Sequence, residues 1–312
     1  MRRIVFFVIA LLLLVSFGAG LVGRAIGPGL LHPMRLNPAR LQQTAEMLER
    51  TGATKEDFNV RTRDGVELHG WTIRPRSANG EWVLLLHGVS DNRTGVLGHA
   101  EFLLRHSYSL VMMDSRAHGE SGGDMATYGW KERQDTVGVV NALYSTEKTR
   151  HLYALGVSMG AAVALQSAVI EPRIEGVVAE DPFADLREVS YDYAGLRLSP
   201  FLGETLFRPA SVFAMEALAK TGGFDPDDVS PEKAVAARPI PVLLICGTRD
   251  TTIPCRHAEK IYRAASGPKE FWVVNGAEHA SALGQAPEAY EEKVVHFLRE
   301  VANGHLSKSD RG

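Results

Sequence analysis

Ser158 stands in a five-residue pattern that serine nucleophiles use. Residues 156–160 read Gly-Val-Ser-Met-Gly, which is a Gly-x-Ser-x-Gly sequence. A short apolar run from residue 151 precedes the pattern, and a run of small apolar residues follows it to residue 170. These runs predict a strand, a sharp turn and a helix, the context in which such a serine is presented for reaction. The alternative is a structural serine in a turn.

An aspartate and a histidine follow this serine in the order that its chemistry requires. A serine hydroxyl is a weak nucleophile until a base takes its proton and a carboxylate orients that base. Asp250 and His279 each follow an apolar run, so both are expected at the strand ends where sites form in parallel sheets. We predict that Ser158, Asp250 and His279 form a catalytic triad. Asp181, one strand earlier, is the alternative acid.

Acyl transfer also needs N–H groups that stabilise a tetrahedral oxyanion. The N–H of Met159, directly after the serine, is one candidate. The second donor should come from the loop after the strand expected at 82–86, where the sequence reads His-Gly-Val-Ser from residue 87. We predict the N–H of Val89 as this donor, with Ser90 as the alternative.

The elements that position these residues follow from the apolar pattern. Continuous apolar runs separated by helical segments predict a mostly parallel sheet with helices on both faces. Before them, an Asp-Gly turn at 64–65 between alternating segments predicts a hairpin over 58–73. The expected strands lie at 82–86, 109–113, 152–155, 174–179, 242–246 and 270–274, and the helices near 94–106, 131–146, 159–170, 254–265 and 287–302.

One interval is too long for a simple crossover between strands. About 60 residues rich in aromatic side chains separate the strand that ends near residue 180 from the next. We predict that 182–237 form a helical cap, with an ordinary pair of packing helices as the alternative. The core would then comprise 55–181 and 238–302, and 303–312 would form a tail.

The N-terminus carries an unbroken apolar stretch from residue 4 to residue 23, after Arg2 and Arg3. About 20 residues suffice to cross the hydrocarbon core, whereas a signal peptide has a shorter apolar core. We therefore favour an uncleaved transmembrane anchor at 1–23 over a signal cleaved near Gly18-Ala19-Gly20. Arginines lie on both sides of the span and do not decide its orientation. The short basic head resembles an export signal, so we expect the catalytic domain outside the cytoplasm, and cleavage would make the protein secreted. Residues 24–54 are expected to form a connector, non-helical over 27–38, and then a helix.

Composition and net charge limit the classes of partner that this protein is expected to bind. The chain has 312 residues, a net charge of -3 and no basic excess, which argues against nucleic-acid binding. The expected partners are a small-molecule or lipid ester and, through the N-terminal segment, a membrane, with no required protein partner evident. Cys246 and Cys255 have no metal-ligand spacing, and we expect two separate thiols, with a disulfide between them as the less favoured alternative. The triad chemistry needs no metal or organic cofactor.

Together these segments resemble the α/β-hydrolase superfamily over about residues 55–302. The closest resemblance is to a bacterial branch similar to serine aminopeptidases and acyl-peptidases, which includes membrane-anchored hydrolases. Ala117 stands where many relatives have glycine. The motifs that carry the resemblance are His87-Gly88, Asp114-x-Arg-x-His-Gly-x-Ser121, the serine turn, Gly247-Thr-Arg-Asp250 with Ile253-Pro254, and Glu278-His279.

The resemblance implies an α/β-hydrolase fold with an eight-stranded sheet and an enzyme that works through an acyl-enzyme. Serine at the turn argues against the dehalogenases and epoxide hydrolases of this fold, which use aspartate there. We expect a serine hydrolase of the carboxylesterase type. The alternatives are a peptidase that cleaves amides, a lysophospholipase or other lipid-ester hydrolase, and, least favoured, a non-catalytic binding module.

Overall fold

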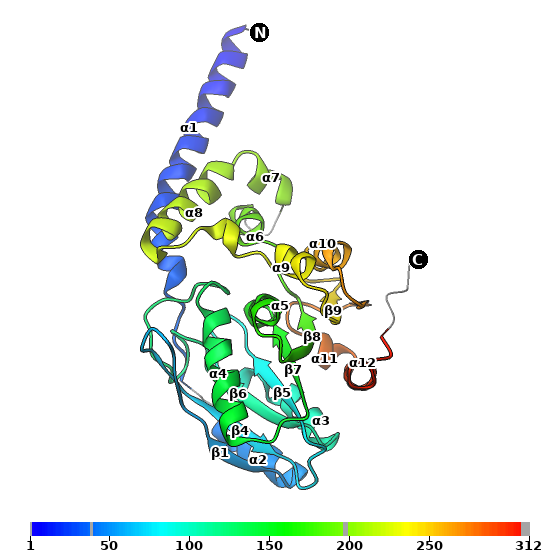
Figure 1. The fold of residues 1–312 in the computed structure, drawn as a ribbon. Coiled ribbons are helices and arrows are strands. Elements are labelled where there is room, and N and C mark those ends of the chain that lie inside the picture. Colours follow the sequence, from blue (N-terminus) through cyan, green and yellow to red (C-terminus); the bar gives the residue numbers. More distant parts are fainter. Residues whose placement is uncertain (1, 38–39, 196–198, 307–312) are drawn as a thin grey trace.

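An eight-stranded, mostly parallel sheet forms the centre of the molecule (Figure 1). The computed structural model describes residues 2–37, 40–195 and 199–306. The strand order is β1-β4-β6-β5-β7-β8-β9-β10; β4 runs antiparallel to β1 and β6, and the other neighbours are parallel. All six expected strands are confirmed. The strands are β1 (Thr54–Asp57), β4 (Gly70–Arg74), β5 (Glu81–Leu86), β6 (Ser109–Met113), β7 (His151–Val157), β8 (Ile174–Glu180), β9 (Val242–Gly247) and β10 (Lys269–Val274).

Helices cover both faces of this sheet, which explains why its strands are continuously apolar. In β5, Val83 and Leu85 belong to one core cluster, whereas Leu84 and Leu86 belong to the cluster on the opposite face. The first cluster is closed by α2 (Leu41–Thr51), α3 (Leu97–Arg105) and α12 (Pro287–Asn303). The second is closed by α4 (Glu132–Thr146), α5 (Met159–Ile170), α9 (Pro231–Ala237) and α10 (Arg256–Ala264).

The predicted hairpin is shorter than expected. Its turn forms as predicted, with Thr62 N donating to Val66 O and Gly65 at φ 87°. It joins only β2 (Val60–Arg61) to β3 (Glu67–Leu68), a separate two-stranded ribbon. The chain then enters the large sheet as β4, because the face formed by residues 71 and 73 is buried in the main core.

Helices occupy the interval between β8 and β9. They are α6 (Leu186–Ala194), α7 (Pro200–Glu204), α8 (Arg208–Gly222), the short η3 (Pro226–Asp228) and α9. The helices α6, α7 and α8 pack on one another beyond the strand ends (Figure 1), and we call these three helices the cap. In contrast, α9 packs against α5 and α10 beside the sheet. The domain boundaries at 182 and 237 stay a prediction.

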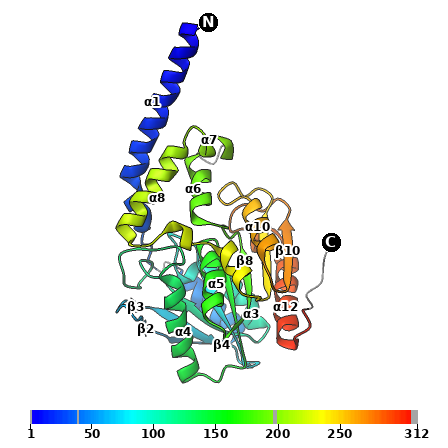
Figure 2. The same cartoon turned by 45° about the horizontal axis from the view of Figure 1, so that its top comes forward.

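The N-terminal segment is a long apolar helix that is joined to the cap. Helix α1 (Arg2–Ile26) is long and apolar enough to cross a membrane, as a signal sequence near an N-terminus can also be. It continues into the 3₁₀ helix η1 (Gly27–Leu31), so the expectation of a non-helical connector is wrong for 27–31. The C-terminal half of α1 lies along α8, while its N-terminal half projects from the molecule (Figures 1 and 2). At the other end of the chain, α12 ends at Asn303, and 307–312 lie outside the described residues.

Candidate active site

Ser158 lies in a strained turn between β7 and α5. Its backbone has φ 56° and ψ −119°, and its N–H donates to Glu180 O at 2.8 Å. A Cβ on Gly156 would lie 2.2 Å from Gly160 O, and a Cβ on Gly160 would lie 2.2 Å from Leu86 O. Only glycine fits at both positions, because larger residues would separate the helix from the strands. The turn therefore holds the serine at the carboxyl edge of the sheet.

The structure brings the three predicted triad residues into contact. Ser158 Oγ lies 2.9 Å from His279 Nε2, and His279 Nδ1 lies 2.7 Å from Asp250 Oδ2. The other carboxylate oxygen of Asp250 accepts from Thr252 N and Ile253 N at 2.7 and 2.9 Å. One oxygen thus fixes the acid in its loop, while the other orients the imidazole. This arrangement can pass a proton from the hydroxyl to the ring.

The alternative acid, Asp181, lies behind the histidine. Its Oδ2 is 3.9 Å from His279 Nδ1, beyond hydrogen-bonding distance, and accepts from Ala280 N at 2.7 Å. Its Oδ1 accepts from Gly247 N at 3.2 Å. Asp181 therefore ties the histidine loop to the end of β9, and Asp250 holds the position that orients the ring.

Charge and burial shift both titrating groups in this cluster. Burial raises the pKa of Asp181 to about 7, and the carboxylates of Glu180 and Asp250 add to the rise. Burial alone would lower the pKa of His279, but the hydrogen bond with Asp250 and the nearby negative charges outweigh it and raise the pKa. The imidazole is therefore a stronger base than a free histidine.

The same three side chains have donor atoms that a metal ion could use. Asp181, Asp250 and His279 offer one ligand atom each within 4.8 Å of one another. A metal here would displace the bond between His279 and Asp250 and the bond from Ala280 N to Asp181. The donor set is thus already occupied by hydrogen bonds that organise the site.

The predicted oxyanion donors flank the serine. A Cβ on Gly88 would lie 3.5 Å from Ser158 Cβ, so the loop that carries Val89 runs beside the hydroxyl. His87 anchors this loop through its Nδ1, which lies 2.8 Å from Gly88 O. Among the described residues, the N–H groups of Val89 and Met159 have no acceptor. Both are therefore free to donate to a substrate oxygen.

Comparisons with known proteins identify the family of this chain. The model of the Alpha/beta hydrolase family matches residues 83–293. The chain is a member of this family. Esterase Pf2001 of Pyrococcus furiosus superposes with a TM-score of 0.69 at 27% identity, covering 86% of this chain and 99% of that one. The fold and the superfamily predicted from the sequence are thereby confirmed.

Bacterial proteins of similar length are also related to this alpha/beta hydrolase. The uncharacterized protein YqkD of Bacillus subtilis is 28% identical over 262 residues, which cover 82% of this chain and 81% of that protein. The uncharacterized protein YfhR of Escherichia coli K12 is 25% identical over 256 residues, covering 80% of this chain and 82% of that protein. The more specific resemblance to the peptidase branch stays a prediction.

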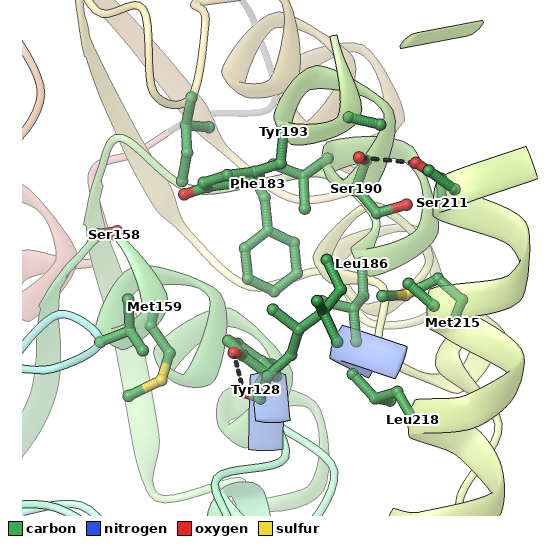
Figure 3. Close-up of a pocket in the computed structure, with 18 residues that line it drawn as sticks. Tyr128, Ser158, Met159, Phe183, Leu186, Ser190, Tyr193, Ser211, Met215 and Leu218 are labelled. Atoms are coloured by element: carbon green, nitrogen blue, oxygen red, sulfur yellow. Dashed lines mark hydrogen bonds between the residues drawn. The ribbon is translucent and has the colours of Figure 1, made fainter. Parts of the chain in front are cut away.

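An uncharged pocket of about 280 Å³ adjoins the serine of this hydrolase (Figure 3). Ser158 and Met159 lie on one side of it, and Met215 and Leu218 of α8 lie on the other. The wall also includes residues of the N-terminal segment. The sequence pattern did not predict that this segment lies near the site. The remaining lining residues are Ile26, Leu30, Val89, Tyr128, Phe183, Leu186, Val189, Ser190, Tyr193, Ala194, Ala210, Ser211, Ala214 and Ile253.

A disulfide brackets the acid loop, so the expectation of two separate thiols is wrong. Cys246 lies at the end of β9 and Cys255 directly before α10, with their Cα atoms 5.4 Å apart. Cys246 is fully buried, as its apolar run predicted. The turn through Asp250 reverses the chain and returns Cys255 to the strand end. Sequence spacing could not reveal this return.

The loop after β6, which carries the motif that begins at Asp114, is held by buried hydrogen bonds. Asp114 accepts from Arg93 N and Glu120 N at 2.7 and 2.8 Å, and Ser121 Oγ donates to Asp114 O at 2.7 Å. Ala117 has φ 61°, which explains why glycine suits this position in relatives. These buried bonds fix the backbone of the loop.

Proposed function

We propose that this protein is a membrane-anchored serine hydrolase that cleaves carboxylic esters through an acyl-enzyme. The observation that carries the proposal is the continuous chain of hydrogen bonds from Ser158 Oγ through His279 to Asp250, at 2.9 and 2.7 Å. Family membership supports hydrolysis, and the likeness to esterase Pf2001 supports an ester substrate.

In the first half of the reaction, Ser158 Oγ attacks the ester carbonyl carbon while His279 Nε2 takes the hydroxyl proton. The carbonyl oxygen gains a negative charge, which the N–H groups of Val89 and Met159 stabilise. Asp250 stabilises the imidazolium that forms. The intermediate then collapses, the C–O bond to the alcohol breaks, and His279 gives its proton to the departing alkoxide.

In the second half, water takes the place of the alcohol. His279 removes a proton from the water as it attacks the acyl carbon of the ester on Ser158. A second oxyanion forms in the same place, and its collapse releases the carboxylic acid and returns the proton to Ser158. Each step uses only side chains and backbone amides of this chain.

The pocket favours an ester over a peptide substrate. An aminopeptidase needs a carboxylate that binds the positive terminus of its substrate, and the described residues that line this pocket carry no charge. An apolar wall of this kind suits an aliphatic acyl group, whose transfer from water stabilises the complex by about 0.8 kcal/mol per buried CH₂.

The disulfide and α1 support a place outside the cytoplasm. Disulfides persist in oxidising compartments and are rare in the cytosol, and the bond between Cys246 and Cys255 joins the two ends of the loop that carries Asp250. We infer that α1 anchors the protein and that the catalytic domain faces the oxidising side. Protease added to intact cells should digest the domain, whereas protection until the membrane is lysed would contradict this orientation.

The test of the function is the hydrolysis of short-chain nitrophenyl esters by full-length protein in detergent. Ser158→Ala should lower kcat by several orders of magnitude, because the nucleophile is lost. Ser167→Ala is the matched control: it removes a hydroxyl from α5, the helix that follows Ser158, and that hydroxyl is buried without a partner among the described residues. Retained turnover in Ser158→Ala would exclude the proposal.

A further inference from the structure

The end of the N-terminal helix is built into the pocket beside Ser158. Ile26 of α1 and Leu30 of η1 both line that pocket. Tyr128 OH donates to Leu30 O at 2.5 Å, and Ala126 N donates to Leu31 O at 2.8 Å. Leu31 is fully buried in the core cluster that also contains cap residues. This segment is therefore part of the folded domain.

The last turns of α1 and the start of η1 pack closely on the cap helix α8. A Cβ on Gly23 would lie 2.0 Å from Ala210 O, and a Cβ on Gly27 would lie 2.3 Å from Ala214 O. The two backbones can approach this closely only because glycine stands at both positions. Since Ala210 and Ala214 also line the pocket, α1 holds one wall of the pocket and supplies another.

The length of α1 places part of the cap at the depth of the bilayer. At residue 16 the helix already contacts the turn between α7 and α8, where Ser16 Oγ donates to Leu206 O at 3.2 Å. Residues 4–15 rise only about 18 Å as a helix, but the hydrocarbon core is about 30 Å thick. The helix can cross it only if residues 16–23 lie within it as well. The part of the cap that they contact must then enter the membrane surface.

The cap carries exposed apolar side chains on both α7 and α8. Phe201 of α7 is 70% exposed, and Phe213 of α8 is 40% exposed although it packs on Gly20. Leu202 is exposed beside Phe201. Figures 1 and 2 place α7 and α8 at the end of the molecule from which α1 projects. A water-soluble surface rarely groups such side chains, whereas a membrane interface favours them.

We propose that the pocket takes the long acyl chain of an ester lipid drawn from the bilayer, and that Ile26 and Leu30 set the chain length that fits. This inference rests on the proposed serine hydrolase and on α1 as its anchor. The acyl chain passes from the membrane surface between α1 and the cap and fills the uncharged pocket. The ester carbonyl then reaches Ser158. The anchor is thus a specificity element of the enzyme as well as its tether.

The first test is the acyl-chain profile of full-length protein in detergent, measured as kcat/KM for nitrophenyl esters from acetate to palmitate. Leu30→Trp fills the pocket, so the ratio of palmitate to acetate kcat/KM should fall at least tenfold. Ile26→Ala with Leu30→Ala enlarges the pocket, so the preferred chain should become longer. Misfolding could not shift the profile in both directions.

Val22→Trp is the matched control, because Val22 is exposed on the same helix and does not line the pocket. It should leave the profile unchanged. An unchanged profile in both sets of pocket variants, or the same shift in Val22→Trp, would overturn the inference.

The second test distinguishes a bilayer source from a dissolved one. Protein in dioleoylphosphatidylcholine vesicles is given methylumbelliferyl oleate, which partitions into the bilayer, or methylumbelliferyl acetate, which is soluble. Phe201→Asp should lower oleate turnover at least fivefold and leave acetate turnover unchanged, because Phe201 lies outside the pocket. Equal effects on both esters, or none, would overturn entry from the bilayer.

Ser158→Ala separates this inference from the function on which it rests. If Ser158→Ala abolishes hydrolysis but the pocket variants leave the profile unchanged, only the inference fails. If Ser158→Ala retains hydrolysis, the proposed function fails.

Discussion

The carboxylate of Asp181 lies 3.9 Å from the Nδ1 atom of His279. The ring nitrogen is already hydrogen bonded to another carboxylate, that of Asp250, at 2.7 Å. Two carboxyl groups therefore face one imidazole, and each has different partners on the backbone. The nearer one orients the ring, and the farther one acts through its charge and through its bond to Ala280 N.

This arrangement predicts the pH dependence of ester hydrolysis. His279 must be neutral to accept a proton, and its raised pKa means that kcat/KM reaches half its plateau above pH 6.5. Asp181→Asn removes a carboxyl group whose ionised form favours the imidazolium, so the acid limb should move to lower pH. An Asn side chain can still accept from Ala280 N. The pH profile of kcat/KM for a soluble acetyl ester checks this, and a limb that stays in place or moves upward would contradict it.

The two acids should differ in their effect on kcat. Asp250→Asn removes the carboxylate that fixes the tautomer of His279, so kcat should fall by about 10³–10⁴. Asp181→Asn should lower kcat less than tenfold at its own optimum pH. Steady-state kinetics on both variants measure the difference. A larger loss in Asp181→Asn would make Asp181 the orienting acid.

The disulfide should stabilise the loop that carries Asp250. Cys246 and Cys255 are separated by 9 residues, and closing a loop of this size contributes roughly 2–3 kcal/mol. Cys246→Ala with Cys255→Ala should lower the free energy of unfolding by about this amount in urea titrations. Dithiothreitol should have a similar effect on the wild type and none on the double variant. Sensitivity of the double variant to the reductant would show that another process is responsible.

The contact between α1 and α8 should depend on glycine at one position and not at another. Gly23→Leu forces a side chain toward Ala210 O, whereas Gly18→Leu meets nothing within 4 Å. Gly23→Leu should separate the helices, destabilise the cap by about 1–3 kcal/mol and speed amide exchange in α8. Hydrogen exchange of the two variants in detergent compares them directly. Equal exchange in both would mean that α1 does not pack on α8 in this way.

The strands, and the meeting of the three side chains that we propose as a triad, were predictable because they depend on local sequence. Buried parallel strands are continuous apolar runs, and Ser158, Asp250 and His279 each follow one, so the parallel topology alone brings them to one edge. The sequence did not predict that Asp250 and Asp181 would both contact the loop that carries His279. Choosing between the two acids required distances, because both follow adjacent strands.

The packing of the N-terminal segment on the cap could not be predicted from hydropathy. Hydropathy predicts only that α1 can span a membrane, and Gly20 enters that prediction only as part of an alternative cleavage site. Its recurrence with Gly23 and Gly27 is the signal that could have predicted helix packing, but the partner helix lies more than 180 residues away. The disulfide was the less favoured alternative because the return of the chain over nine residues depends on the turn through Asp250.

Covalent labelling tests most directly whether Ser158 is the nucleophile. Full-length protein is treated with a fluorophosphonate ester, digested and mapped by peptide mass spectrometry. We expect one phosphonate on Ser158, slower labelling in Asp250→Asn and no labelling of that peptide in Ser158→Ala. A phosphonate on another serine, or a wild-type protein that stays unlabelled while it hydrolyses esters, would contradict the account.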